Sequence, residues 1–216
     1  MAINDTTLAN LALMVVGEVT VTDVNTDTGK AANLVKTVLE PCRDEIFDLP
    51  VNWNFCSTRK ELSEHESTPD FGWDHQYILP VNCRRIIATV DENGDDIQYP
   101  WIREVYISGS NETEVLLSNQ DECRIRYIVL MKKPNTWPAW FAKMVYLNIA
   151  MKICKPLTQE YQKYNQVVQW YLKAVEDAEA ANGMECAATD DNNVNLDHGH
   201  TIFDRAVVDR VTEIQS

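Results

Sequence analysis

The sequence predicts an α+β protein in which helices from both ends of the chain form one bundle that carries an inserted antiparallel β-lobe. Apolar residues recur at helical spacing before residue 50 and after residue 137, whereas residues 55–131 alternate short β-rich runs with turn sequences. The first pattern gives way to the second at Leu49-Pro50-Val51-Asn52-Trp53-Asn54-Phe55. We therefore expect three parts. They are a discontinuous four-helix bundle (1–52 and 132–183), a β-rich lobe (53–131) and an extended acidic C-terminal tail (184–216).

The N-terminal part contains two helical patterns. Residues 5–16 predict a short helix that Asp5 or Thr6 caps and Gly17 ends. The second pattern runs from about Gly29 to residue 49. Pro41 lies inside it and lacks a backbone N–H, so we expect a kink or a break there.

The middle of the chain changes to a strand pattern. Its β-rich runs are 55–62, 76–79, 85–90, 105–108, 114–117 and 123–131. The turn sequences Glu92-Asn93-Gly94-Asp95 and Ser108-Gly109-Ser110-Asn111 separate some of them. These features predict a small antiparallel sheet or barrel.

Helical spacing returns in the C-terminal part. Thr136 is the expected cap of the third helix, and Pro156 is its expected end. We expect Thr158 to cap the last long helix and Gly183 to end it.

Bulk composition narrows the class of protein. The chain has 216 residues and a formal net charge of −14, which disfavours a general nucleic-acid binder because phosphate neutralisation needs a basic surface. It shows neither an apolar run of membrane-spanning length nor a signal-peptide pattern, so we expect a cytoplasmic origin. Its six cysteines are scattered without a C-x-x-C pair, and we expect them to be buried apolar residues.

Charge is distributed unevenly along the sequence. Residues 132–182 carry +3, whereas residues 1–52, 53–131 and 183–216 carry −5, −7 and −5. We expect the lysines of the basic region either to meet an acidic surface, of this chain or of a neighbour, or to be merely solvated. The candidate partner-interface residues are Lys143, Lys152, Lys155, Lys163 and Lys173 in the helices, and Phe203, Val207 and Val208 in the tail.

No cofactor or metal site is predicted. Gly29-Lys30 lacks the first glycine and the Ser/Thr of a phosphate loop. The alternating Asp and Asn residues after Asp191 lack the glycine and closing glutamate of a calcium loop. His198 and His200 make a poor metal site by themselves.

Several short motifs are similar, in their order and spacing, to those of one family. The matching residues are Asn10-Leu11-Ala12-Leu13 before Gly17, Ala31-Ala32, Arg43-Asp44-Glu45, Pro50 with Trp53-Asn54-Phe55, Arg59, Leu62, Tyr77 with Leu79-Pro80, Cys83-Arg84, Tyr127, Trp137-Pro138 and Phe141. With the tyrosine-striped last helix, they span about residues 4–182. Over this range the chain resembles the head-to-tail adaptors of short-tailed bacteriophages, also called tail tubular protein A or gatekeeper-ring proteins.

The resemblance implies a structural virion protein without catalysis. Such adaptors form a ring, commonly a dodecamer, beneath the portal protein of a filled capsid, and a tail nozzle of the tail tubular protein B kind attaches below. Genomic DNA passes only as cargo, and an acidic surface suits that role because it repels phosphate. The protein would be made in the host cytoplasm, would need no membrane anchor and would reside in the virion tail. Trp53 and Phe55 are the residues we expect to fix the junction between bundle and lobe.

Two other classes remain open. A phage-associated glycan or peptidoglycan hydrolase would need a carboxylate pair in the lobe. Candidates are Asp91, Glu92, Asp95, Asp96 and Glu104. A head-completion protein of a long-tailed phage is the other class, although such proteins tend to be smaller and mostly helical.

Overall fold

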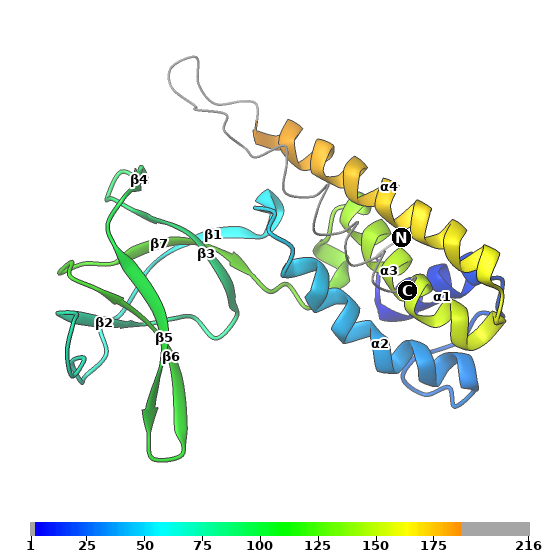
Figure 1. Cartoon of the computed structure of the whole chain (residues 1–216), viewed down its shortest axis with the longest axis horizontal. Helices are drawn as coiled ribbons and strands as arrows, with labels where there is room; N and C mark the ends of the chain where they lie inside the picture. The colour runs from blue at the N-terminus through cyan, green and yellow to red at the C-terminus, as the bar shows by residue number, and fades with distance from the viewer. Residues whose placement is uncertain (1–2, 187–216) are drawn as a thin grey trace. The chain divides into compact units, whose positions relative to one another are not determined.

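The computed structural model describes residues 3–186, which fold as a mixed α+β structure (Figure 1). The helices are α1 (Asp5–Val16), α2 (Lys30–Phe47), α3 (Ala139–Thr158) and α4 (Tyr161–Cys186), with short 3₁₀ turns η1 (Asn54–Cys56) and η2 (Pro134–Thr136). The strands are β1 (Ser57–Glu61), β2 (His75–Ile78), β3 (Cys83–Val90), β4 (Asp96–Ile97), β5 (Trp101–Ser108), β6 (Asn111–Ser118) and β7 (Arg124–Val129). The predicted α+β class is confirmed, with two helices before the strands and two after them.

Helix α1 has well-defined caps. Its N-cap is Asn4, whose side-chain oxygen accepts a hydrogen bond from the Thr7 amide at 2.8 Å, so the predicted cap at Asp5 or Thr6 is wrong. The predicted end at Gly17 is confirmed. That residue adopts a φ of 76°, which costs little without a Cβ.

The helix ends predicted at the two prolines are wrong, whereas the kink predicted as the alternative at Pro41 stays a prediction. Helix α2 continues through Pro41, and α3 continues through Pro156 to Thr158. A proline inside a helix costs about 3 kcal/mol. Leu39 and Ile46, on either side of Pro41, are both buried, and each such side chain contributes about 1.5–3 kcal/mol. Burial of the flanking residues therefore offsets the lost hydrogen bond.

The other predicted helix ends shift as well. The N-cap of α3 is Pro138, and Thr136 lies in η2. Thr158 is the last residue of α3, where its hydroxyl donates to the Cys154 carbonyl at 2.9 Å. Gly183 lies inside α4, so the predicted end there is also wrong.

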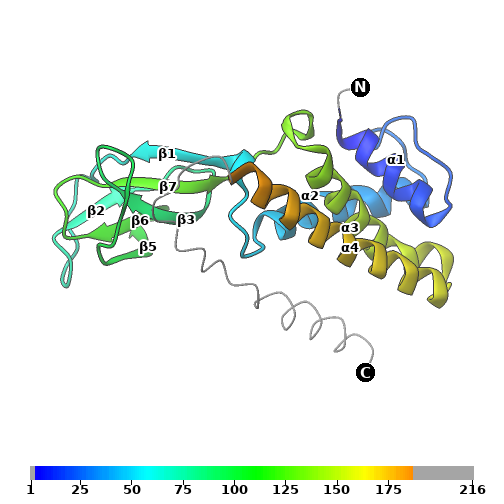
Figure 2. The same cartoon turned by 90° about the horizontal axis from the view of Figure 1, so that it is seen from above.

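The strands form two antiparallel sheets. One has the order β1-β7-β3-β4 and the other β2-β6-β5 (Figures 1 and 2). Nine buried residues of the lobe form one hydrophobic cluster, against which Trp101 and Val129 pack. Its members are Leu62, Tyr77, Leu79, Cys83, Ile86, Leu116, Cys123, Ile125 and Tyr127.

Candidate functional site

The connector, residues 48–56, joins α2 to β1 and contains both residues predicted at the junction. Trp53 is fully buried, and its indole N–H donates to the Ile46 carbonyl at 3.2 Å. The Trp53 ring lies 5.6 Å from that of Trp140 and 5.8 Å from that of Phe141. Phe55 lies 4.7 Å from Phe141. Both residues therefore pack in an aromatic cluster against α2 and α3.

Two arginines of β3 bind the connector from the lobe. The Arg85 guanidinium donates to the Leu49 carbonyl at 2.6 Å and also to the Val51 carbonyl. Arg84 pairs with Asp48 at 2.8 Å. Burial lowers the pKa of Arg85, which nevertheless remains a charged donor at neutral pH. The arginines hold the lobe to the end of α2.

An irregularity in β3 explains why two successive side chains point the same way. Side chains of a regular strand alternate between its faces. The register between β3 and β7 shifts between Cys83 and Arg85, so Arg84 is an extra residue in the ladder. Such a bulge re-aims a side chain. Strand periodicity alone would not have identified this arginine pair.

Asn182 of α4 is the third group that holds the connector. Its side-chain amide donates to the Asn52 carbonyl at 3.0 Å, and its side-chain oxygen accepts from the Asn54 amide at 2.8 Å. The Asn54 side chain in turn donates to the Asn182 carbonyl at 2.9 Å. Asn182 is only 8% exposed. Helical periodicity does not reveal Asn182, because the pattern that predicts a helix consists of apolar residues.

Three of the lysines predicted at a partner interface face acidic groups of their own chain. Lys143 lies 3.6 Å from Asp177, and Lys173 lies 3.2 Å from the same carboxylate. Lys152 lies 3.4 Å from Glu45 of α2. All these groups are substantially exposed, so each pair contributes about 0–1 kcal/mol. For these three lysines, the acidic partners are therefore carboxylates of the same chain.

The remaining interface candidates fall in different places. The Lys155 ammonium lies 4.0 Å from the centre of the Tyr164 ring, a cation–π contact. The Lys163 ammonium lies so close to Gly17 that a Cβ there would come within 2.8 Å of it. This places a positive charge beside the C-terminal end of α1, where the helix dipole favours it. Phe203, Val207 and Val208 lie outside the described residues.

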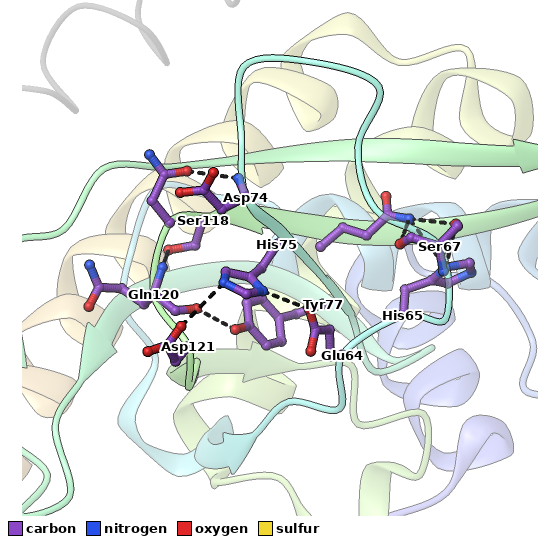
Figure 3. A network of polar contacts seen from close by, with 11 residues as sticks. Glu64, His65, Ser67, Asp74, His75, Tyr77, Ser118, Gln120 and Asp121 are labelled. Carbon is purple, nitrogen blue, oxygen red and sulfur yellow. Dashed lines mark hydrogen bonds and ion pairs between the residues drawn. The ribbon is translucent and has the colours of Figure 1, made fainter.

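A polar network surrounds the start of β2 (Figure 3). The His75 ring bonds to the Glu64 carboxylate at 2.7 Å and lies 3.4 Å from Asp121. Its hydrogen bond to Glu64, aided by the nearby carboxylates, raises the pKa of His75 above its ordinary value. The imidazole therefore holds its proton to a higher pH than a free histidine.

The same network fixes the segment before β2 onto that strand. The His65 amide donates to the Gln76 carbonyl at 2.8 Å, and the Ile78 amide donates to the Ser63 carbonyl at 2.9 Å. The Gln76 side chain donates to the Ser67 carbonyl at 2.5 Å. Residues 63–65 therefore cover the outer edge of β2.

The carboxylates considered for a hydrolase lie mainly around the β3–β4 turn. Asp91 and Glu92 line a hollow of about 280 Å³ beside β3. Asp91 accepts hydrogen bonds from the Asp95 and Asn93 amides, both at 2.9 Å, and these bonds lower its pKa. Asp96 pairs with Arg126 at 2.8 Å. Asp91 therefore lacks the raised pKa of a general acid.

We also examined metal binding, cysteine reactivity and membrane spanning for the described part of the chain. Across residues 3–185, no cluster of three or more His, Cys, Asp or Glu side chains could hold a metal ion. The five cysteines described there are free and buried, and burial raises the pKa of Cys42 and of Cys56 to about 12. Among the described helices, none is both long and apolar enough to cross a bilayer.

Comparison with known proteins adds no relative. No protein-family model matches the chain, and no curated protein matches it.

Proposed function

We propose that the chain is a head-to-tail adaptor, a structural virion protein that forms a ring between the phage portal and the tail nozzle. The observation that carries the proposal is the connector, where helices from both ends of the chain and an inserted β-lobe meet. Arg85 of the lobe, Trp53 in the aromatic cluster and Asn182 of α4 all hold it. A subunit with a helical part and a protruding lobe offers separate surfaces for neighbours and for the two ends of the ring.

The finer organisation belongs to the same proposal. Residues 1–52 and 132–183 act as one four-helix bundle, and residues 53–131 act as the lobe. The predicted tail, residues 184–216, lies outside the described residues from residue 187 onward. A formal charge of −14 suits a DNA conduit, because an acidic wall repels phosphate and lets the genome pass. The ring, proposed as a dodecamer, would need no cofactor and no catalytic group.

Sedimentation velocity tests the proposal directly. The purified chain is run alone and with the portal protein of the phage that encodes it. We expect a large complex that contains both proteins, with the adaptor in ring stoichiometry. An unrelated ring protein of similar acidity, in place of the portal, controls for non-specific association. A chain that stays monomeric and ignores the portal would contradict the proposal.

A further inference from the structure

The second sheet leaves the outer edge of β5 unpaired among the described residues. That sheet has the order β2-β6-β5, and residues 63–65 already cover the edge of β2. A two-residue turn, Gly109-Ser110, joins β5 to β6, so its flanking residues Ser108 and Asn111 form a hydrogen-bonded pair. Alternation along the ladder then directs the backbone N–H and C=O groups of Val105 and Ile107 away from β6. These groups are available to another strand.

The side chains on this edge are apolar and acidic. Val105 is 53% exposed and Ile107 is 65% exposed. Glu104 and Glu112, on β5 and β6, are exposed and form no ion pair with another described residue. Unpaired edges of this kind are templates for strand addition. Figure 1 shows the outer part of the β5–β6 hairpin extending beyond the other strands.

The first sheet has a free edge of the opposite charge. Strand β1 pairs with β7 on one side, and no described strand pairs with its other side. Arg59 and Lys60 on β1 are exposed and form no ion pair with another described residue, whereas Glu61 is paired with Arg124 at 2.9 Å. Two unbalanced positive charges therefore lie on β1, and two unbalanced negative charges lie on the β5–β6 hairpin.

We propose that the β5 edge of one copy pairs with the β1 edge of the next copy, so that sheets of neighbouring subunits join. The inference rests on the proposed ring and names its lateral contact. Opposite charges favour pairing of β5 with β1, and like charges oppose pairing of β5 with β5 or of β1 with β1. A contact between two different surfaces is heterologous, which is the kind that closes a ring.

A reciprocal charge exchange in the full-length chain tests this contact. One variant is Glu104→Lys with Glu112→Lys, and the other is Arg59→Glu with Lys60→Glu. Each alone brings like charges together, so we expect its self-association to weaken by roughly tenfold or more in sedimentation velocity. A one-to-one mixture restores opposite charges at every contact. We expect it to assemble like the wild-type chain.

Two controls keep the test specific. Lys132→Glu with Lys133→Glu changes the same number of charges on exposed residues outside the two strand edges and should leave association unchanged. Val105→Pro removes an outward N–H without removing a β5–β6 hydrogen bond, and it should block association while the circular dichroism spectrum stays native.

Different results would contradict the β5–β1 contact and the adaptor function. Charge variants that associate like the wild type, or a mixture that fails to restore assembly, would overturn the β5–β1 contact. A wild-type chain that stays monomeric at every concentration, with and without portal, would overturn it too. An assembly that shows the expected charge dependence but ignores the portal would keep this contact and contradict the adaptor function.

Discussion

At the scale of single residues, Trp53 has the clearest structural role in the connector. The fully buried ring packs against Trp140 and Phe141. We expect Trp53→Ala to lower the free energy of unfolding by about 3–5 kcal/mol, measured by urea denaturation. Trp170→Ala is the matched control, because that ring is 44% exposed, and it should cost clearly less. Equal midpoints for Trp53→Ala and the wild type would contradict the role.

Arg85 holds the connector through the geometry of its guanidinium as well as through its charge. One fork donates to the carbonyls of both Leu49 and Val51. Lysine keeps the charge but cannot reproduce the fork, so Arg85→Lys should cost on the order of 1–3 kcal/mol. Arg59→Lys, on an exposed strand residue, should be near neutral. A near-neutral Arg85→Lys in the same denaturation assay would show that charge alone suffices.

His75 gives the lobe a pH-dependent contact. Its pKa in the folded state is raised, chiefly by the hydrogen bond to Glu64. The stabilisation is therefore fully present below the unfolded pKa of about 6.5, and it is lost as the pH rises through the folded pKa. We expect Glu64→Gln to return the His75 pKa toward its ordinary value in an NMR titration. Asp121→Asn should shift it less, and a Glu64→Gln chain that titrates like the wild type would contradict this assignment.

At the scale of the elements, sequence patterns located the helices better than their ends. The helical stripe of α2 was visible, but Pro41 suggested a kink or a break, and α2 runs through it between the buried residues Leu39 and Ile46. The rule that proline ends a helix fails at this position, because burial of the neighbouring apolar side chains outweighs the loss of one backbone hydrogen bond.

The sequence pattern also predicted the strands incompletely. The predicted run 105–108 covers only half of β5, which begins at Trp101, because Arg103 and Glu104 interrupt the apolar pattern. Arg103 is nevertheless accommodated in β5, because its guanidinium donates a hydrogen bond to the Arg84 carbonyl at 2.9 Å. Strand β4 is two residues long, too short for any period to reveal.

The change from helix to strand between α2 and β1 was visible in the sequence, but most contacts of the connector were not. Trp53 and Phe55 were identified because aromatic residues at the change of pattern suggest packing. Arg85 and Asn182 contact residues more than 30 and 120 positions away, respectively. Such polar partners leave no periodic signal in a single sequence.

The end of α4 is coupled to the connector through Asn182. Its side-chain oxygen accepts the Asn54 amide hydrogen, and its amide donates to the Asn52 carbonyl. We expect Asn182→Ala to speed hydrogen exchange at the Asn54 amide by NMR, because an accepting oxygen is lost. Asn165→Ala, on the same helix but away from these contacts, should leave that amide unchanged. Unaltered exchange in Asn182→Ala would contradict the coupling.

At the scale of the whole molecule, the charged residues that pair within the chain differ from those proposed to pair between chains. Lys143, Lys152 and Lys173 meet carboxylates of their own chain. The unbalanced charges considered for assembly lie instead on the lobe, at β1 and the β5–β6 hairpin. We therefore expect raised salt to weaken subunit association more than it lowers the stability of the subunit, since exposed charges are screened most. Sedimentation and denaturation at the same salt concentrations compare the two.

Electron microscopy of the intact phage tests the adaptor function most directly. We expect a ring of density directly beneath the portal and above the tail nozzle, and we expect copies of this α+β chain to fit it with both their helices and their lobes. The DNA channel should pass through its centre. Density for the chain elsewhere in the particle, or a particle that lacks the chain, would contradict the adaptor function.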